Sequence, residues 1–296
     1  MATGQDRWAE WLLRRRYGGD AAALQHLLSE LRPIRDAVLD HARIVEGDVV
    51  LDVGAGDGLI AFGALERVGP TGAVMFSDIS QDLLDHARVL AEQIGVAERC
   101  RFLRVSADDL GALADRAVDV VTTRSVLIYV ENRAGAFREF FRMLKPGGRL
   151  SIFEPINRFG WPEPPHRLLG ADVTPLPDSA AQVNAVYHRH WPPDTDPMIT
   201  FDERDLLAAA EGAGFGEIHL ELRADVAPLP AQAWDTFSRI AFNPQMPTFE
   251  EALAEARSDG LTRAEAERLV AHIRPQVEAG RLVLRLASAY LWASKS

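Results

Sequence analysis

The chain of 296 residues contains one cysteine, Cys100, so an intramolecular disulfide and a metal site built from several cysteines are excluded. Cys100 stands beside an apolar strand pattern, which predicts a buried and unreactive thiol. No apolar run is long enough to span a membrane. The N-terminal region has neither the apolar core of a signal peptide nor the scarcity of acids typical of a transit peptide. We therefore expect a cytoplasmic protein without a membrane partner.

Positive charge is also scarce, because 32 lysines and arginines face 43 acidic residues and leave a formal net charge of −11. This balance disfavours a long surface for phosphate contacts, so no nucleic-acid partner is expected. The sequence has no internal repeat and no low-complexity tract. Hydrophobic residues make up 47% of the chain, which is enough for one large domain or for one domain with an appended cap.

One glycine-rich stretch carries most of the chemical information. A Val- and Leu-rich strand over 49–53 is followed by Gly54-x-Gly56-x-Gly58 and a helical pattern over 59–68. This strand–turn–helix unit is typical of a doubly wound α/β sheet, whose ligands bind at the carboxyl ends of the strands. The spacing differs from the dinucleotide fingerprint G-x-G-x-x-G. Asp52 and Asp57 disfavour a pyrophosphate and favour a ligand with an ammonium group. A chance glycine-rich turn is the alternative.

Strand and helix patterns alternate after this unit. Strands are predicted over 73–78, 100–105, 216–223 and 284–293, and helices over 81–94 and 201–213. The stretch 119–130 is predicted to hold a fourth strand and its exit loop, and 144–155 a turn and a fifth strand that ends at Glu154. Asp78 ends the second strand about twenty residues after the last motif glycine. An acid at that position can accept hydrogen bonds from both hydroxyls of a ribose.

The glycine stretch resembles motif I, LDxGxGxG, of the class I S-adenosylmethionine-dependent methyltransferases. Three further elements agree in order: the acid after the second strand, the loop over 106–110 and the Lys-Pro-Gly-Gly turn over 145–148. The resemblance covers 45–156, 200–224 and 284–294. It implies a Rossmann-like methyltransferase fold, a doubly wound and mostly parallel seven-stranded sheet with a helical N-terminal cap and a helical insertion before the last strand.

The same resemblance implies that S-adenosyl-L-methionine is the cofactor and that a small molecule accepts the methyl group on O, N or C. The chain looks most like the branch that includes ubiquinone-biosynthesis and arsenite methyltransferases, which favours a natural-product acceptor. A single cysteine disfavours the arsenite activity. The N/D-P-P-Y/F motif of DNA-amine and glutamine methyltransferases is missing after the fourth strand.

Residues of the glycine motif and of the loops after the strands are expected to hold the cofactor. They are Asp52, Gly54, Ala55, Gly56, Gly58, Asp78, Ile79, Ala107, Asp108, Arg124 and Ser125. Ser106 stands where the family usually has Asp, so the side chain that meets the adenine is left open. A helix cap is the alternative role of Asp108. Tyr17 is expected near the carboxylate of the donor.

The predicted organisation has three parts. Residues 1–44 form a helical cap or lid, in which Pro33 opens a helix. Residues 45–225 plus 283–296 form the catalytic core, and its segment 157–198, rich in proline, is expected to be an irregular substrate lid. Residues 226–282 form the helical insertion, with a capping box at Thr262 and Glu265.

A general base is useful when the acceptor is a hydroxyl. The candidates are His188, His190, His166 and Glu154 in that order, and each has a structural role as its alternative. The side chains expected to face the substrate are Tyr129, Trp161, Tyr187 and Trp191. They favour an aromatic or apolar acceptor, although Trp161, Tyr187 and Trp191 are equally consistent with a lid core. His188-x-His190 has no matching Cys or His pattern, so no metal is expected.

Two other functions fit parts of the pattern. A nicotinamide-dependent oxidoreductase is disfavoured by the glycine spacing and by Asp52. A non-catalytic module that binds S-adenosylmethionine would have the same donor site. The sequence does not predict the oligomeric state.

Overall fold

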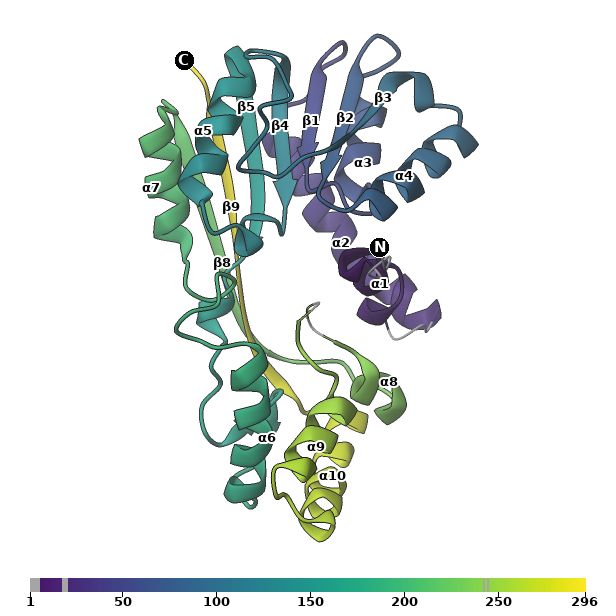
Figure 1. Ribbon diagram of the computed structural model, residues 1–296, viewed down its shortest axis with the longest axis vertical. Helices are drawn as coiled ribbons and strands as arrows, with labels where there is room; N and C mark the ends of the chain where they lie inside the picture. The colour runs from purple at the N-terminus through teal and green to yellow at the C-terminus, as the bar shows by residue number, and fades with distance from the viewer. Residues whose placement is uncertain (1–5, 18–20, 242, 244) are drawn as a thin grey trace, which may run out of the picture.

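The structure is a computed structural model that describes residues 6–17, 21–241, 243 and 245–296, without the side chains of 17 and 21–23. It has an upper lobe built on a sheet and a lower lobe that contains α6, α8, α9 and α10 (Figure 1). Among the described helices, none combines the length and the hydrophobicity needed to cross a bilayer.

The upper lobe is a seven-stranded sheet in the order β3-β2-β1-β4-β5-β9-β8. Its strands are β1 (Val49–Val53), β2 (Ala73–Asp78), β3 (Cys100–Arg104), β4 (Val118–Arg124), β5 (Leu144–Pro155), β8 (Ile218–Pro228) and β9 (Val283–Ser294). The first five are parallel, whereas β9 is antiparallel to both β5 and β8. The predicted fold class is confirmed.

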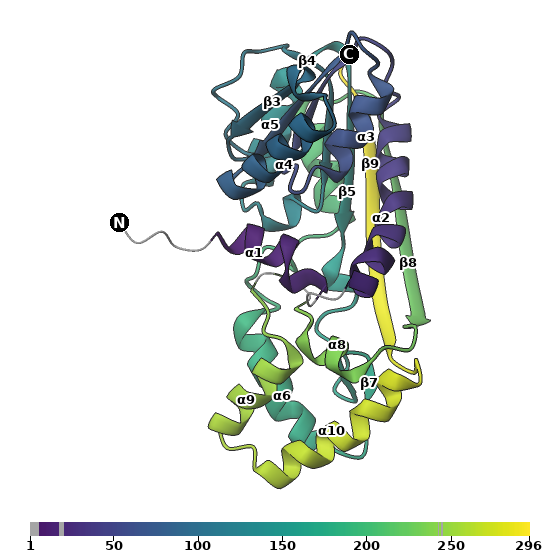
Figure 2. The ribbon, with the colours of Figure 1, turned by 90° about the vertical axis from the view of Figure 1, so that its right-hand side faces the viewer.

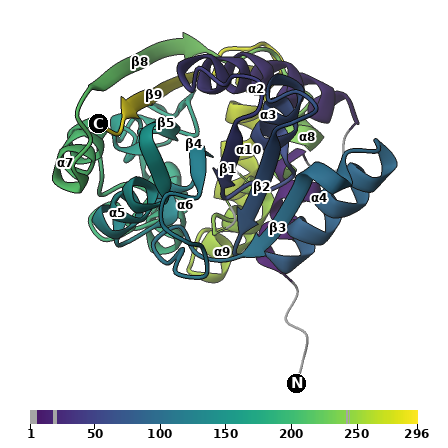
Figure 3. The same ribbon diagram turned by 90° about the horizontal axis from the view of Figure 1, so that it is seen from above.

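Helices cover both faces of the sheet (Figure 3). Buried side chains of α2, α3 and α4 pack together on one face, and those of α5 and α7 pack on the other. These helices are α2 (Ala21–His41), α3 (Leu59–Arg67), α4 (Gln81–Gln93), α5 (Arg133–Met143) and α7 (Glu203–Ala213). The Ser80 side chain caps α4 as predicted, because it accepts a hydrogen bond from the Leu83 amide.

Pro33 does not open a helix, because α2 runs through it without a break. A proline inside a helix deprives the carbonyl of the fourth preceding residue of its donor. That residue is Ser29, which is exposed, so water can solvate the freed carbonyl. The N-terminal part before α2 consists of α1 (Arg7–Leu13) and the short helix η1 (Arg15–Tyr17).

The segment 157–198 is not irregular, which corrects the expectation of an unstructured lid. It contains η4 (Asn157–Phe159), the two-residue strands β6 (Arg167–Leu168) and β7 (Ala171–Asp172), and the helix α6 (Pro177–His190). Pro177 occupies the first position of α6, where no intrahelical N–H bond is lost. The buried side chains of Ala180, Val183 and Val186 then form the face that enters the core.

Three helices lie between β8 and β9, as the sequence predicts. They are α8 (Trp234–Arg239), α9 (Phe249–Ser258) and α10 (Arg263–Glu278). The predicted capping box is present, because Thr262 and Glu265 each accept a hydrogen bond from the other's backbone N–H. α9 packs against α6, so the insertion and the segment after β5 together make the lower lobe (Figure 2).

Candidate functional site

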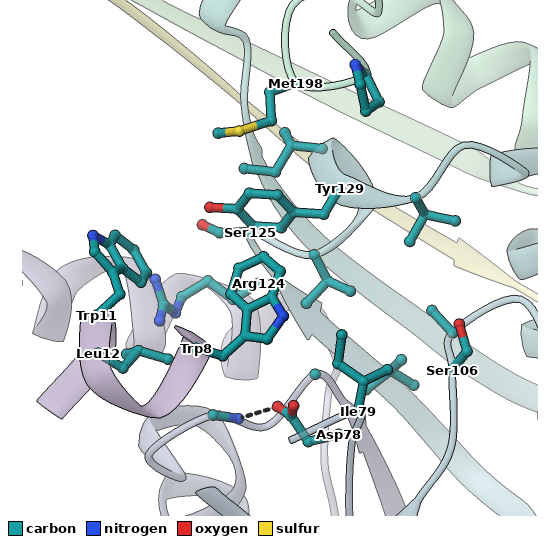
Figure 4. A pocket seen from close by; sticks show the side chains of 18 of the residues that line it. Trp8, Trp11, Leu12, Asp78, Ile79, Ser106, Arg124, Ser125, Tyr129 and Met198 are labelled. Carbon is teal, nitrogen blue, oxygen red and sulfur yellow. Dashed lines mark hydrogen bonds between the residues drawn. The ribbon is translucent and has the colours of Figure 1, made fainter. Parts of the chain in front are cut away.

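A cavity of about 560 Å³ lies at the carboxyl ends of the central strands. Its floor comes from the loops after β1, β2 and β4, and α1 covers it from the side of the lower lobe (Figure 4). This is where a doubly wound sheet binds ligands. Of the residues predicted to contact cofactor or substrate, these line the cavity: Gly54, Gly56, Asp78, Ile79, Ala107, Asp108, Arg124, Ser125 and Tyr129.

The glycine loop shapes the floor of the cavity. Gly54, Gly56 and Gly58 all have positive φ angles, of 67°, 56° and 88°. A Cβ on Gly54 would overlap the side chain of Val126, so only glycine lets the two loops meet. Gly58 begins α3, and neither it nor Ala55 reaches the cavity. The loop therefore presents bare backbone to a ligand at its first two glycines.

Asp78 is held at the end of β2 by two backbone bonds. Its Oδ2 accepts from the Gly56 N–H and its Oδ1 from the Ser80 N–H, both at 2.9 Å (Figure 4). Burial raises the pKa of this carboxyl. The side chain thus ties the glycine loop to β2 while it faces the cavity, which fits the ribose contact expected of it.

The loop after β3 closes the next side of the cavity. Ala107 is buried and Asp108 is half-buried, and both line the wall. The Ser106 hydroxyl donates to Asp108 Oδ1, which fixes the carboxylate toward its own loop. Ser106 also lines the cavity, so the position that departs from the family pattern keeps a polar side chain at the wall.

Asp52 lies under the glycine loop and not on the cavity wall. It is 1% exposed, and its Oδ1 accepts from the Thr122 hydroxyl at 2.9 Å. Its Oδ2 is buried and has no hydrogen-bond partner within the described part of the chain. Burial raises its pKa from 3.8 to about 7. Because Asp52 is buried beneath the loop and does not line the cavity, the contact with the cofactor expected of it is not present in the structure.

Two arginines from different elements line the cavity. Arg124 ends β4, and Arg16 comes from η1. Ser125, which follows Arg124, has a φ of 56°, in the left-handed region that non-glycine residues rarely adopt. Its amide donates to the Phe153 carbonyl at 2.8 Å, and this bond helps to hold the strained turn at the cavity wall.

Glu154 explains how the loop after Ser125 is kept in place. It is fully buried at the end of β5, and its Oε1 accepts from the Val126 and Leu127 amides at 2.9 Å. Its Oε2 accepts from the Ile128 amide at 3.2 Å. Burial raises its pKa to about 7. Because both oxygens are occupied and the side chain does not line the cavity, Glu154 is a positioning residue, which corrects its prediction as a base.

The sequence predicts a helical cap over 1–44, but it did not single out the side chains with which α1 lines the cavity. The α1 side chains Trp8, Trp11 and Leu12 point toward Arg124 and Tyr129 (Figure 4). The rings of Trp8 and Tyr129 meet edge to face, with centroids 4.7 Å apart. Further lining residues that sequence reasoning did not single out are Arg7, Arg16, Val126, Ile128, Asn157, Met198 and Gln245. The signal in the sequence for this part of the wall was the pair Trp8 and Trp11, which are spaced to lie on one face of a helix. The side chain of Tyr17 lies outside the described residues.

Three contacts join the N-terminal segment that contains α1 and η1 to both lobes. The Ser80 hydroxyl donates to Asp6, which caps α1. The Trp11 indole donates to the Ala241 carbonyl at 3.3 Å. Arg15 forms a 3.0 Å ion pair with Glu251 of α9. This segment therefore bridges the cofactor loops and the insertion.

The predicted histidines lie away from the cavity. His188 and His190 are exposed near the end of α6, and His190 Nε2 is 2.8 Å from Glu255 of α9. His166 is also exposed, and none of the three lines the cavity. The expectation that these histidines lie beside a reacting group is therefore wrong. The C-terminal turn of α6 lies on the surface of the lower lobe, away from the cavity.

The three lid aromatics form part of the core. Trp161, Tyr187 and Trp191 are all less than 10% exposed, and the rings of Trp161 and Trp191 stack with centroids 5.2 Å apart. The Trp161 indole donates to the Trp191 carbonyl at 3.2 Å. They join α6 to the segment after β5, and the expected substrate contact is not present.

Comparison with known proteins agrees with this geometry. A family model described as a methyltransferase domain matches residues 44–203, more than half of the chain. The ubiquinone/menaquinone biosynthesis C-methyltransferase of Klebsiella pneumoniae is 33% identical over 116 residues, which are 39% of this chain and 46% of that protein. The homologous enzyme of Cronobacter sakazakii is 31% identical over 127 residues, covering 40% and 50%. The matched region thus spans about half the length of these curated relatives.

Solved structures show the same fold at low sequence identity. A putative methyltransferase from Bacillus halodurans C-125 is 21% identical with a TM-score of 0.52, covering 88% of this chain and 98% of that one. A geranyl diphosphate methyltransferase in complex with S-adenosylmethionine is 17% identical with a TM-score of 0.51, covering 94% and 92%. With the motif, the sheet order and the family match in agreement, this chain belongs to the class I S-adenosylmethionine-dependent methyltransferases.

Proposed function

We propose that this chain transfers a methyl group from S-adenosyl-L-methionine to an anionic small molecule with an aromatic or apolar body. The observation that carries the choice of acceptor is the pair Arg16 and Arg124 in one cavity. Within the described part of the chain, neither guanidinium has an ion pair. Arginines are well suited to bind carboxylates and other planar anions.

The charges of the site favour an anion beyond the donor itself. Burial and the like charge of Arg124 lower the pKa of Arg16 to about 10, so Arg16 is still charged at neutral pH. The carboxylate of the donor can neutralise one arginine. The described lining has three arginines (Arg7, Arg16 and Arg124) and three acids (Asp78, Asp108 and Glu131), and the donor adds a carboxylate, an ammonium group and a positive sulfur, so one net positive charge is left for the acceptor.

The donor would be held by the loops at the strand ends. Gly54 and Gly56 offer bare backbone, Asp78 is placed for the ribose hydroxyls, and Ala107 and Asp108 are placed for the adenine. The bound donor supplies an electrophilic methyl group on its positive sulfur. The protein has to align the nucleophile and exclude water.

The cavity supports an acceptor that is already ionised. None of the described residues that line it is a histidine. Arg16 and Arg124 favour the charged form of an acidic acceptor, so no base has to remove its proton. Trp8, Trp11 and Met198 form apolar walls for its body. A small aromatic or apolar acid satisfies all three conditions and fits the biosynthetic role expected from the sequence.

The donor is tested first, by calorimetric titration with S-adenosylhomocysteine and separately with NADH. Micromolar binding of S-adenosylhomocysteine alone supports the proposal. Binding of NADH alone would refute it and favour an oxidoreductase.

The acceptor class is tested on protein saturated with S-adenosylhomocysteine, by tryptophan fluorescence. Naphthoate and its neutral amide, naphthamide, are the matched probes. We expect naphthoate to bind about tenfold or more tightly, and Arg124→Met or Arg16→Met to remove that preference, because a hydrogen bond to a charged group contributes about 1.5–3 kcal/mol. Arg263→Met, an exposed position on α10, is the control. Equal binding of the two probes would refute the anionic acceptor and leave the donor assignment intact.

A further inference from the structure

β8 is an open edge of the sheet. It is the last strand in the sheet order and is eleven residues long, and it lies at the rim of the molecule (Figures 2 and 3). Its second half is exposed, with Leu222 at 45% and Val226 at 61%. Natural proteins usually keep exposed edge strands short, covered or interrupted, because an open edge pairs with other strands. A long and exposed edge therefore calls for a partner.

The hydrogen-bond pattern shows which residues of β8 face that edge. The Leu229 amide donates to the Leu282 carbonyl at one end of the β8–β9 hairpin, and the Ser294 amide donates to the Glu217 carbonyl at the other. Bonding alternates along an antiparallel strand, so the odd-numbered residues of β8 bond to β9. The even-numbered residues over 218–226 direct their N–H and C=O groups outward. Among the described residues, none of these groups is hydrogen-bonded to another element.

The charged residues of β8 are complementary to the same strand turned around. In an antiparallel pair of two β8 strands centred on Leu222, Glu221 of each copy lies opposite Arg223 of the other. His219 lies opposite Asp225 in the same register. These positions are non-hydrogen-bonded pairs, in which the side chains come closest. Opposite charges directly across strands are favourable, whereas like charges are not.

The remaining residues of β8 agree with this register. Leu222 pairs with its own copy, Leu220 lies opposite Ala224, and Ile218 lies opposite Val226. All of these are outward-facing positions, so each pair exchanges two backbone hydrogen bonds. If the register shifted by one residue, each outward-facing residue would lie opposite a residue whose N–H and C=O groups already bond to β9. These backbone hydrogen bonds between the two copies would then be lost.

Both ends of the register stop at residues that do not continue a strand. Pro228 occupies an outward-facing position, where it has no N–H to donate, and Gly216 stands opposite it in the register. Gly216 and Pro228 are equally far from Leu222. The complementary stretch and its two ends therefore share one centre of symmetry.

We infer that two copies of this chain pair through β8, antiparallel about a two-fold axis at Leu222, and join their sheets into one. The contact is isologous, since each strand offers the same surface to the other. It leaves the mouth of each cavity free, because the cavity lies at the strand ends and not along β8.

Sedimentation velocity over a concentration series tests this pairing in the full-length protein. We expect the wild type to form a dimer that dissociates on dilution. Glu221→Arg and Arg223→Glu each place like charges across the axis twice, and we expect each to raise the dimer dissociation constant about tenfold or more. The double variant with both changes restores opposite charges and is expected to restore the dimer. Arg263→Glu, a charge reversal on the exposed face of α10, is the control.

A second variant acts on the backbone alone. Leu222→Pro removes an outward-facing N–H but no bond to β9, so we expect a folded monomer. Far-ultraviolet circular dichroism and S-adenosylhomocysteine affinity report that each variant is folded. A wild type that is monomeric at all concentrations, a dimer that survives both single charge reversals and Leu222→Pro, or a double variant that does not recover the dimer would each overturn the inference.

Discussion

Replacing Asp52 by Asn tests how the buried acid of the glycine motif affects stability. In the folded chain the carboxyl has a pKa of about 7, because burial outweighs its hydrogen bond from Thr122. In the unfolded chain its pKa is 3.8. Between about pH 4 and about pH 7 the folded chain keeps a proton that the unfolded chain has released. Stability therefore falls as pH rises through this window.

The size of the effect follows from the two pKa values. A difference of about three pKa units corresponds to about 4 kcal/mol, at about 1.4 kcal/mol each, and this is an upper limit. Asn keeps an acceptor for Thr122 and does not ionise. We expect Asp52→Asn and the wild type to be about equally stable near pH 4. The variant becomes progressively more stable than the wild type up to about pH 8.

The assay is urea unfolding of the ligand-free protein at a series of pH values, followed by tryptophan fluorescence. The difference between the two free energies of unfolding isolates Asp52, because Glu154 contributes a pH dependence of the same sign to both proteins. Asp85→Asn, at an exposed position on α4, serves as the control and should follow the wild type. A difference that is constant from pH 4 to pH 8 would refute the reasoning, since it would mean that Asp52 ionises in the folded chain without a penalty.

Three further predictions concern the cavity and its surroundings. Asp78→Ala should weaken S-adenosylhomocysteine binding about tenfold or more in calorimetry, since two charge-assisted bonds and the expected ribose contact are lost; unchanged affinity would remove Asp78 from the donor site. Glu154→Ala should lower the free energy of unfolding by about 3 kcal/mol, because three buried backbone N–H groups lose their acceptor, with Glu154→Gln less affected; equal stability of both variants to the wild type would contradict the positioning role. His188→Ala and His190→Ala should leave single-turnover rates unchanged, because both side chains are exposed in the lower lobe; a large loss of rate would return them to the list of catalytic candidates.

The strands around the site were predictable because their sequences are consistent with few elements other than a strand. β1 and β2 have the predicted bounds, 49–53 and 73–78, since runs of buried apolar residues end at an aspartate or a glycine. Proline misled the prediction twice. Pro33 lies in a helix whose freed carbonyl is solvated, and Pro177 begins a helix in a segment expected to be irregular. In both cases the environment, and not the residue, decides whether proline breaks the helix.

Only some of the residues that line the cavity were predictable, for a different reason. Gly54, Asp78 and Arg124 follow directly from strands whose ends must meet at one edge. Trp8 and Met198 reach the same cavity from the two segments expected to be lids, but no local pattern shows which side chains of these segments enter it. Only packing of the whole chain brings them together, so periodicity identified them as apolar but not as neighbours.

The position of α1 has a kinetic consequence. α1 and the short helix η1 after it cover the cavity, and their described contacts include those to Ser80, Ala241 and Glu251. When release of a bound ligand requires these helices to move, these contacts have to open, so residence time and affinity both depend on them. Weakening one of these contacts would speed the release of product but would also lower the affinity for the ligand. Selection for fast turnover would therefore favour weaker contacts of these helices, whereas selection for tight binding would favour stronger ones.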